Sequence, residues 1–133
     1  MSNFYVGQEV CEEKVFDVSD VEHFAQISGD CNPIHLDEDY AKRGRFGGTI
    51  VHGLLVSGLI SKIIGMDLPG EGSIYIEQNL QFRRPVYVGE KVIAKVKIND
   101  IDKERNIYSL ETNVYNIKNE CVIKGDAKVL FEG

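Results

Sequence analysis

The segment TIVHGLLVSGLISKIIGM, residues 49–66, is the most apolar stretch of the chain. Its leucine, isoleucine and valine side chains cover nearly the whole circumference of a helix, which is typical of a helix buried in a protein interior. The segment is too short to cross a bilayer. Gly53, Ser57 and Ser61 recur every fourth residue, so one narrow stripe of the helix carries only small side chains. We therefore expect a buried helix whose backbone another group can approach closely.

After residue 73 the period of the apolar residues changes to two, which is typical of strands. The first expected strand places Ile74, Ile76, Leu80 and Phe82 on one face. Residues 92–98, 108–114 and 121–131 supply three more strands. Because short turns join these strands, we expect four neighbours in an antiparallel meander.

The segment before the long helix supplies smaller elements. Residues 4–18 are expected to hold one or two short extended pieces. Ser19 and Glu22 form the pattern of a capping box, which predicts a helix that ends at Gly29. The whole chain, residues 1–133, is therefore expected to be one α+β domain in which a curved sheet wraps one buried helix.

Composition excludes several classes of function. The formal net charge is −6, which argues against general nucleic-acid binding but leaves room for an anionic small ligand at a local basic patch. Cys11, Cys31 and Cys121 are far apart and fit no metal or disulfide spacing, as in proteins of a reducing cytosol. The first residues lack the basic start and apolar run of a leader. We expect a cytoplasmic protein that binds no membrane, no nucleic acid and no metal.

The segment from Ser28 to His35, SGDCNPIH, carries the most reactive side chains. Pro33 fixes its own backbone angle and keeps Asn32 out of the helical region, so a bent, stiff loop is expected. Asp30 and His35 can then face one small space from the two sides of the bend. A carboxylate and an imidazole that share a water are the groups needed to remove and return a proton. The alternative is an ordinary surface turn, because glycine, aspartate, asparagine and proline are common turn residues.

The pair His52 and Gly53 opens the long helix. The first turn of a helix has free N–H groups and carries the positive end of the helix dipole. Gly53 has no side chain, so a ligand oxygen can reach its N–H, and this makes an oxyanion site. The alternative is that Gly53 only permits close packing and that His52 is a core histidine.

Together these segments resemble the MaoC-like (R)-specific enoyl-CoA hydratases. The resemblance rests on SGDCNPIHLD at residues 28–37, RFGGTIVHG at residues 45–53 and FRRPVYVGE at residues 82–90. Glu90 stands where the family usually has aspartate. The resemblance implies a hot dog fold and a homodimer whose sheets join edge to edge. It also implies reversible syn addition of water to a trans-2-enoyl-CoA, which gives a (3R)-3-hydroxyacyl-CoA.

The resemblance also implies roles for single residues. Asp30 and His35 become the catalytic pair, and Gly53 becomes the backbone donor to the thioester oxygen. Ser57 is expected to orient Asp30, and Asn32 to shape the loop near the water. No cofactor is required, because coenzyme A is part of the substrate. Candidates for contacts to the substrate and its phosphates are His52, Arg83, Arg84, Lys62, Lys42 and Arg43.

Three alternatives stay open at this point. A hot dog thioesterase needs a carboxylate on the long helix or a nearby strand, and the absence of one between Gly53 and Met66 counts against it. A non-catalytic acyl-CoA-binding protein has no need of Asp30 and His35, and both are present. A dehydratase that acts on acyl-carrier protein uses the same chemistry with a different handle.

Overall fold

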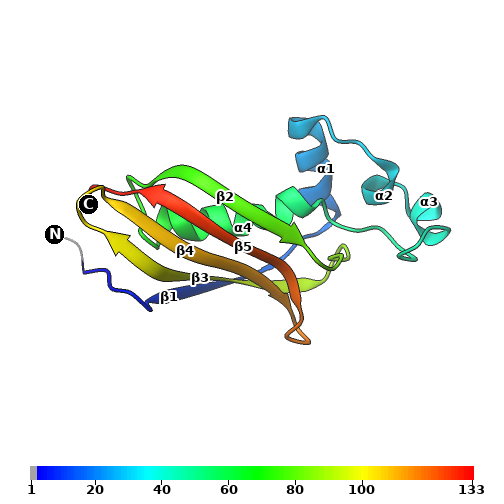
Figure 1. Cartoon of the computed structure of the whole chain (residues 1–133). Coiled ribbons are helices and arrows are strands. Elements are labelled where there is room, and N and C mark those ends of the chain that lie inside the picture. Colours follow the sequence, from blue (N-terminus) through cyan, green and yellow to red (C-terminus); the bar gives the residue numbers. More distant parts are fainter. Residues whose placement is uncertain (1–2) are drawn as a thin grey trace.

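A computed structural model describes residues 3–133 of the chain. One antiparallel sheet and one long helix form its body (Figure 1). The elements are, in order, β1 (Glu9–Val15), α1 (Val18–Ser28), α2 (Pro33–Leu36), α3 (Glu38–Lys42), α4 (Gly53–Met66), β2 (Ile74–Phe82), β3 (Lys91–Asp102), β4 (Ile107–Asn116) and β5 (Cys121–Leu130). The strand order β1-β3-β4-β5-β2 leaves β1 and β2 at the two edges. This is the α+β arrangement that the sequence predicts.

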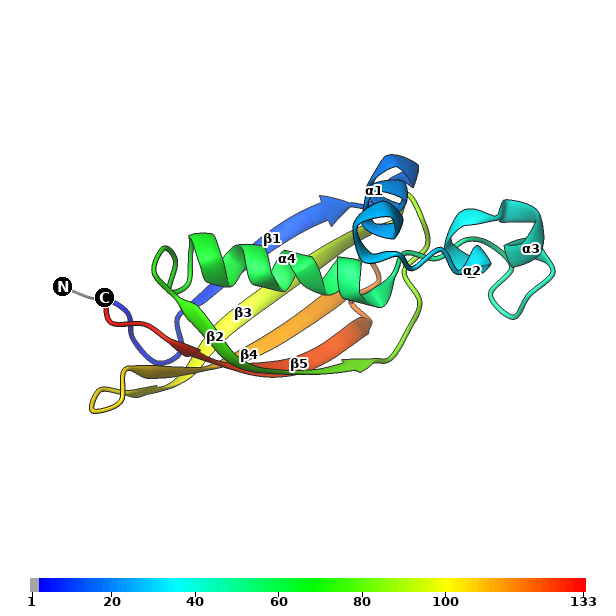
Figure 2. The same cartoon turned by 90° about the horizontal axis from the view of Figure 1, so that it is seen from above.

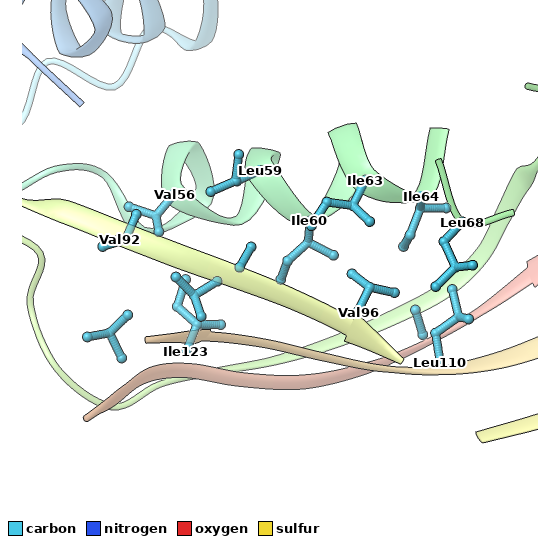
Figure 3. Packing of buried hydrophobic residues seen from close by; sticks show 14 of the residues in the cluster. Val56, Leu59, Ile60, Ile63, Ile64, Leu68, Val92, Val96, Leu110 and Ile123 are labelled. Atoms are coloured by element: carbon cyan, nitrogen blue, oxygen red, sulfur yellow. The ribbon is translucent and has the colours of Figure 1, made fainter. Parts of the chain in front are cut away.

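The helix α4 packs along one face of the sheet (Figure 2). Its buried side chains are Val56, Leu59, Ile60, Ile63 and Ile64. They point toward side chains of the strands, including Val92, Val96, Leu110 and Ile123 (Figure 3). The expectation of a helix buried all round is wrong in one respect, because Leu54 is 62% exposed. The sheet covers one side of α4 only, so part of its apolar circumference faces out.

The expected four-strand meander is wrong for β2. Strands β3, β4 and β5 do follow one another as a meander, but β2 pairs with β5 and not with β3. The connection 83–90 therefore carries the chain from one edge of the sheet to the far side, past the start of α4, where Ile50 and Tyr87 form an isolated bridge. Periodicity shows that strands exist, but the pairing of distant strands is decided by packing on the helix.

The predicted face of β2 also needs correction. The pairing register leaves Ile76 opposite no residue of β5. Beyond this bulge Leu80 and Phe82 lie on the side that faces α4, as expected. On the N-terminal side of the bulge, Tyr75 faces α4, because it pairs with a buried residue of β5. Ile74 faces the opposite side of the sheet. One extra residue in a strand reverses the alternation.

The helix α1 begins two residues earlier than the sequence suggests. Asp17 is the N-cap, and its carboxylate accepts a hydrogen bond from the N–H of Asp20, whose own carboxylate accepts one from the N–H of Asp17. The capping box predicted for Ser19 and Glu22 is therefore wrong in position. Gly29 ends the helix with a φ of 81°, as expected.

The segment 29–50, here called the arm, carries α2 and α3 beyond the end of the sheet, opposite the C-terminus (Figure 2). Asp37 caps α3, as an aspartate directly before a helical stretch favours. The stiff loop expected at Pro33 is in fact one turn of helix, α2, with Pro33 at its start. No helix in the described range, 3–133, is long and apolar enough to cross a membrane. Met1 and Ser2, part of the segment expected not to be a leader, lie outside that range.

Candidate active site

A pocket of about 550 Å³ lies where the arm meets the start of α4. That volume is within the range typical of small-molecule sites. The sequence predicted six of its lining residues as functional: Asp30, His35, His52, Gly53, Arg83 and Arg84. The structure brings together residues that lie up to 54 positions apart in the chain. The residues that the sequence motifs single out therefore also lie close together in the folded chain.

Hydrogen bonds to the backbone fix the imidazole of His35. Its Nδ1 lies 2.8 Å from the carbonyl oxygen of Ile50. Because a carbonyl only accepts, Nδ1 carries the proton and donates it to this bond. In the neutral ring, Nε2 is then an unprotonated nitrogen, which is the form required of a base. The N–H of Ile50 also donates to the carbonyl of Ile34 at 3.2 Å, so two bonds join α2 to the segment that enters α4.

The carboxylate of Asp30 lies at the base of the arm. Its Oδ1 accepts a hydrogen bond of 3.2 Å from the N–H of Asn32. Asn32 in turn caps α2, since its Oδ1 accepts from the N–H of Ile34 at 3.2 Å. Asn32 has a φ of −55° and a ψ of 126°, outside the helical region, as Pro33 was expected to impose. Asn32 therefore shapes the loop, and it does not line the pocket.

Gly53 is the first residue of α4, and His52 supplies no side-chain cap. The N–H at this position has no partner inside the helix. A β-carbon built on Gly53 would lie 2.6 Å from Cδ1 of Phe82, too close for any larger residue unless that ring moves. Phe82 comes from β2 and also lines the pocket. Gly53 thus combines a free donor with a close approach by a neighbouring ring, which the sequence predicted only in general terms.

His52 occupies a different position from the one expected of a substrate contact. Its side chain is 2% exposed, and its Nε2 lies 2.9 Å from the carbonyl oxygen of Asp30. Its ring stacks on that of His35, with ring centroids 3.8 Å apart and an angle of 28° between the planes. The ring of Phe24 is a second neighbour, with its centroid 4.7 Å from that of His52. His52 therefore lies against Asp30 and His35 on their buried side. Polar atoms of Asp30, His35 and His52 all lie within 4.8 Å of one another, a spacing that a metal ion would also accept.

Ser57 does not join this group within one chain. Its hydroxyl donates to the carbonyl of Leu54 at 2.7 Å, and the side chain lines a second hollow between α4 and β2. The small-residue stripe begins at Gly53 but leads away from the arm, toward the exposed side of β2. Ser57 as a partner of Asp30 stays a prediction that this fold alone does not support.

The cations expected near the substrate divide into two groups. Arg83 and Arg84 line the pocket, although Arg83 donates to Gln81 at 2.8 Å and Arg84 pairs with Glu120 at 3.2 Å. Lys62 instead forms an ion pair with Glu12, away from the pocket, which raises the pKa of Lys62. Lys42 and Arg43, on the arm, are also absent from the pocket lining.

Phe24, Arg45 and Phe82 are among the pocket residues to which sequence reasoning assigned no function. Arg45 has no carboxylate within ion-pair distance in the described part of the chain, which makes it the freest cation in the pocket. Arg45 and Phe82 stand in the quoted motifs, so their positions were a signal. Phe24 gave no signal, because it reads as an ordinary residue on the apolar face of α1.

Comparisons with known proteins agree with this geometry. The sequence model of the MaoC like domain family matches residues 6–120. The chain is 39% identical over 124 residues to the (R)-specific enoyl-CoA hydratase of Aeromonas caviae, covering 93% of this chain and 92% of that protein. It is 44% identical over 124 residues to the 3-hydroxybutyryl-CoA dehydratase of Methylorubrum extorquens, covering 93% of this chain and 78% of that protein.

The solved structure of the (R)-hydratase of A. caviae involved in PHA biosynthesis superposes with a TM-score of 0.96 at 37% identity. The superposition covers 98% of this chain and 99% of that one. These similarities confirm the hot dog fold that the sequence predicts. The chain belongs to the MaoC-like domain family.

Proposed function

We propose that this protein is an (R)-specific enoyl-CoA hydratase, which adds water reversibly to a trans-2-enoyl-CoA to give a (3R)-3-hydroxyacyl-CoA. The observation that carries the proposal is the meeting of Asp30 and His35, with polar atoms within 4.8 Å, in a pocket that also contains the free N–H of Gly53. The similarity to hydratases and dehydratases over most of the chain supports it. The reaction class is that of a hydro-lyase.

The proposed reaction begins with a water between Asp30 and His35. The unprotonated Nε2 of His35 removes a proton as the water oxygen bonds to C3 of the substrate, and Asp30 accepts a hydrogen bond that orients the water. The π electrons move toward the thioester oxygen, and the proton is then returned to C2 on the same face. General acid–base help of this kind contributes roughly 10²–10⁴-fold in rate.

The N–H of Gly53 is proposed to stabilise the oxygen that becomes negative. Charge on the thioester oxygen is small in the bound substrate and large in the enolate, so this hydrogen bond strengthens as the reaction proceeds. The free N–H groups and the positive dipole end of α4 both favour that charge. We propose that no metal or other cofactor takes part, although the three clustered side chains make the point worth testing with a chelator.

The proposed handle of the substrate is coenzyme A. Its phosphates need cations, and Arg45, Arg83 and Arg84 all line the pocket of an otherwise acidic protein. Arg45 is the freest of these, because Arg83 donates to Gln81 and Arg84 pairs with Glu120, whereas Arg45 has no such side-chain partner among residues 3–133. Arginine binds phosphate through several parallel donors, which suits this role.

We also propose a homodimer that forms through β2. The two edge strands differ in composition, since β1 carries charged Glu9, Glu12, Glu13 and Lys14, whereas β2 exposes Ile74, Tyr75, Ile76 and Phe82. Charged side chains on an edge strand oppose pairing, and apolar ones favour it. Leu54, also exposed, adds to the same apolar area beside β2. A cytoplasmic location stays a prediction from the sequence.

The test is hydration of crotonyl-CoA and of longer trans-2-enoyl-CoAs, followed by loss of enone absorbance and chiral analysis of the product. We expect (3R)-3-hydroxyacyl-CoA, with the same rate after dialysis against EDTA. Release of free coenzyme A would instead indicate a thioesterase. Faster turnover of the matching acyl-carrier-protein thioesters would show that the substrate is carried by acyl-carrier protein and not by coenzyme A. Binding without turnover of any thioester would refute the proposal.

A further inference from the structure

The imidazole of His52 is almost completely buried, yet one of its nitrogens has no partner. Its Nε2 donates to the carbonyl of Asp30 at 2.9 Å, whereas its Nδ1 has no hydrogen-bond partner among the described residues. Burying an unpaired polar atom costs free energy, so a core histidine chosen only for packing is a poor solution here. The side chain must gain something from its other contacts.

Those contacts reach both members of the proposed catalytic pair. The donated hydrogen bond holds the backbone of Asp30, and the ring stacks on His35 with centroids 3.8 Å apart. Phe24 contacts the His52 ring as well, at 4.7 Å. Since Asp30 is exposed and His35 is only half-buried, packing alone does not set the distance between them. His52 contacts both residues and is itself buried in the core.

The hydrogen-bond pattern also assigns the protons on the two rings. A carbonyl accepts at Nε2 of His52, so in the neutral ring that nitrogen carries the proton and Nδ1 does not. A carbonyl accepts at Nδ1 of His35, so the opposite tautomer is present there. In their neutral forms the two stacked rings therefore have opposite tautomers. In this arrangement a proton gained by Nε2 of His35 is not opposed by a second charge on the ring beneath.

We infer that His52 is the positioning residue of this site: by holding the carbonyl of Asp30 and the ring of His35, it sets the spacing between the acid and the base. This inference rests on the proposed function for its catalytic consequence. It differs from the expectation that His52 contacts the substrate, because its Nε2 is bonded to the carbonyl of Asp30 and its unpaired Nδ1 is buried. A misplacement of about 1 Å in such a pair can cost about 10²-fold in rate.

Two variants separate the two contacts of His52. His52→Phe keeps a ring that can stack on His35 and Phe24 but removes the donor to Asp30. His52→Gln keeps an N–H at about the position of Nε2 and removes the ring. We expect His52→Phe to lower kcat by about 10²-fold with KM changed less than about threefold, and His52→Gln to recover at least tenfold of that loss. The same changes at the exposed His23, whose side chain hydrogen-bonds to Ser19, serve as matched controls and should leave both constants unchanged.

A readout independent of turnover is the ¹⁵N spectrum of the histidine side chains. In the wild-type protein we expect a proton on Nε2 of His52 and on Nδ1 of His35, and in His52→Phe we expect the His35 signals to shift. A rise in KM with normal kcat would overturn the inference and make His52 a substrate contact. Equal loss of kcat in both variants with unchanged His35 signals, or a wild-type His52 protonated at Nδ1, would also overturn it. If the wild type hydrates no enoyl thioester, the proposed function fails. The tautomers seen in the ¹⁵N spectrum then still test the contacts of His52 with Asp30 and His35.

Discussion

Replacing Gly53 by alanine tests whether the free N–H at the start of α4 acts on the developing oxyanion. The new β-carbon would lie 2.6 Å from Cδ1 and 2.7 Å from Cε1 of Phe82, whereas ordinary contacts begin near 3.4 Å. The 2.6 Å separation is 0.8 Å shorter than the shortest ordinary contact, so either Phe82 or the start of α4 must move. Phe82 is 52% exposed and can turn outward, and overpacking, which costs about 1–3 kcal/mol in a closed core, should cost less here.

The catalytic effect should be larger than this packing effect. A methyl group beside the donor displaces the thioester oxygen, and loss of one oxyanion donor costs about 10²–10³-fold in kcat, or about 3–4 kcal/mol. The interaction strengthens in the transition state, so kcat should fall while KM for the enoyl-CoA changes little. We therefore expect Gly53→Ala to lose at least about 10²-fold in kcat and only a few degrees in Tm.

The double variant Gly53→Ala with Phe82→Leu distinguishes the two explanations. Removing the ring relieves the clash but leaves the methyl beside the donor, so kcat should stay low. Phe82→Leu alone is the matched control for the loss of the ring. Recovery of kcat in the double variant, measured by loss of enone absorbance, would show that Gly53 is only a packing residue and would refute the oxyanion role.

Three further predictions follow from the site, the edge strand and one titrating turn. Asp30→Asn and His35→Ala should each abolish hydration while Tm and the dimer persist, with the double variant little worse than either, because residues that act as a unit are non-additive; near-normal kcat in either one contradicts the assignment. The wild type should sediment as a dimer and Ile76→Lys as a monomer, because the variant places a charge on the apolar edge strand β2. If the variant is still a dimer, β2 is not the dimer interface. A hydrogen bond from Asn116 lowers the pKa of Glu120 below 4.5, so the stability that this carboxylate contributes is present above 4.5 and lost as pH falls through the lower folded value. The Tm difference between wild type and Glu120→Gln should therefore shrink in acid, and a pH-independent difference would contradict this.

The parts of the fold that the sequence predicted well depend on residues close together in the chain. The start of α4 at Gly53, the end of α1 at Gly29 and the cap at Asp37 all follow from local patterns. The placement of β2 beside β5 could not be predicted in this way, because both edges of a meander offer the same hydrogen bonds. The bulge at Ile76 was hidden for a related reason: an isoleucine fits either face of a strand, so the sequence does not mark where the alternation reverses.

The same distinction separates the site residues. Asp30 and His35 lie in one loop, so their meeting could be expected from the bend at Pro33. The roles of Ser57 and His52 depended instead on which way each side chain points from α4. Helical spacing places Gly53 and Ser57 on one stripe but does not tell which stripe faces the arm. The structure shows that the stripe leads toward β2, and that His52 lies on the side of the catalytic pair.

The arm that carries Asp30 and His35, the proposed catalytic pair, has little core of its own. Of residues 29–50, only Ala41 is buried, so apolar packing cannot hold the acid and the base at a fixed spacing. The spacing depends instead on bonds to two residues at the entry of α4: Ile50, which binds Ile34 and His35, and His52, which binds Asp30 and stacks on His35. Both are continuous with the helix that forms the core. These few bonds therefore allow a polar arm to position a water as precisely as groups in the core are positioned. Substitutions at the entry of α4 should accordingly affect kcat more than substitutions on the exposed surface of the arm.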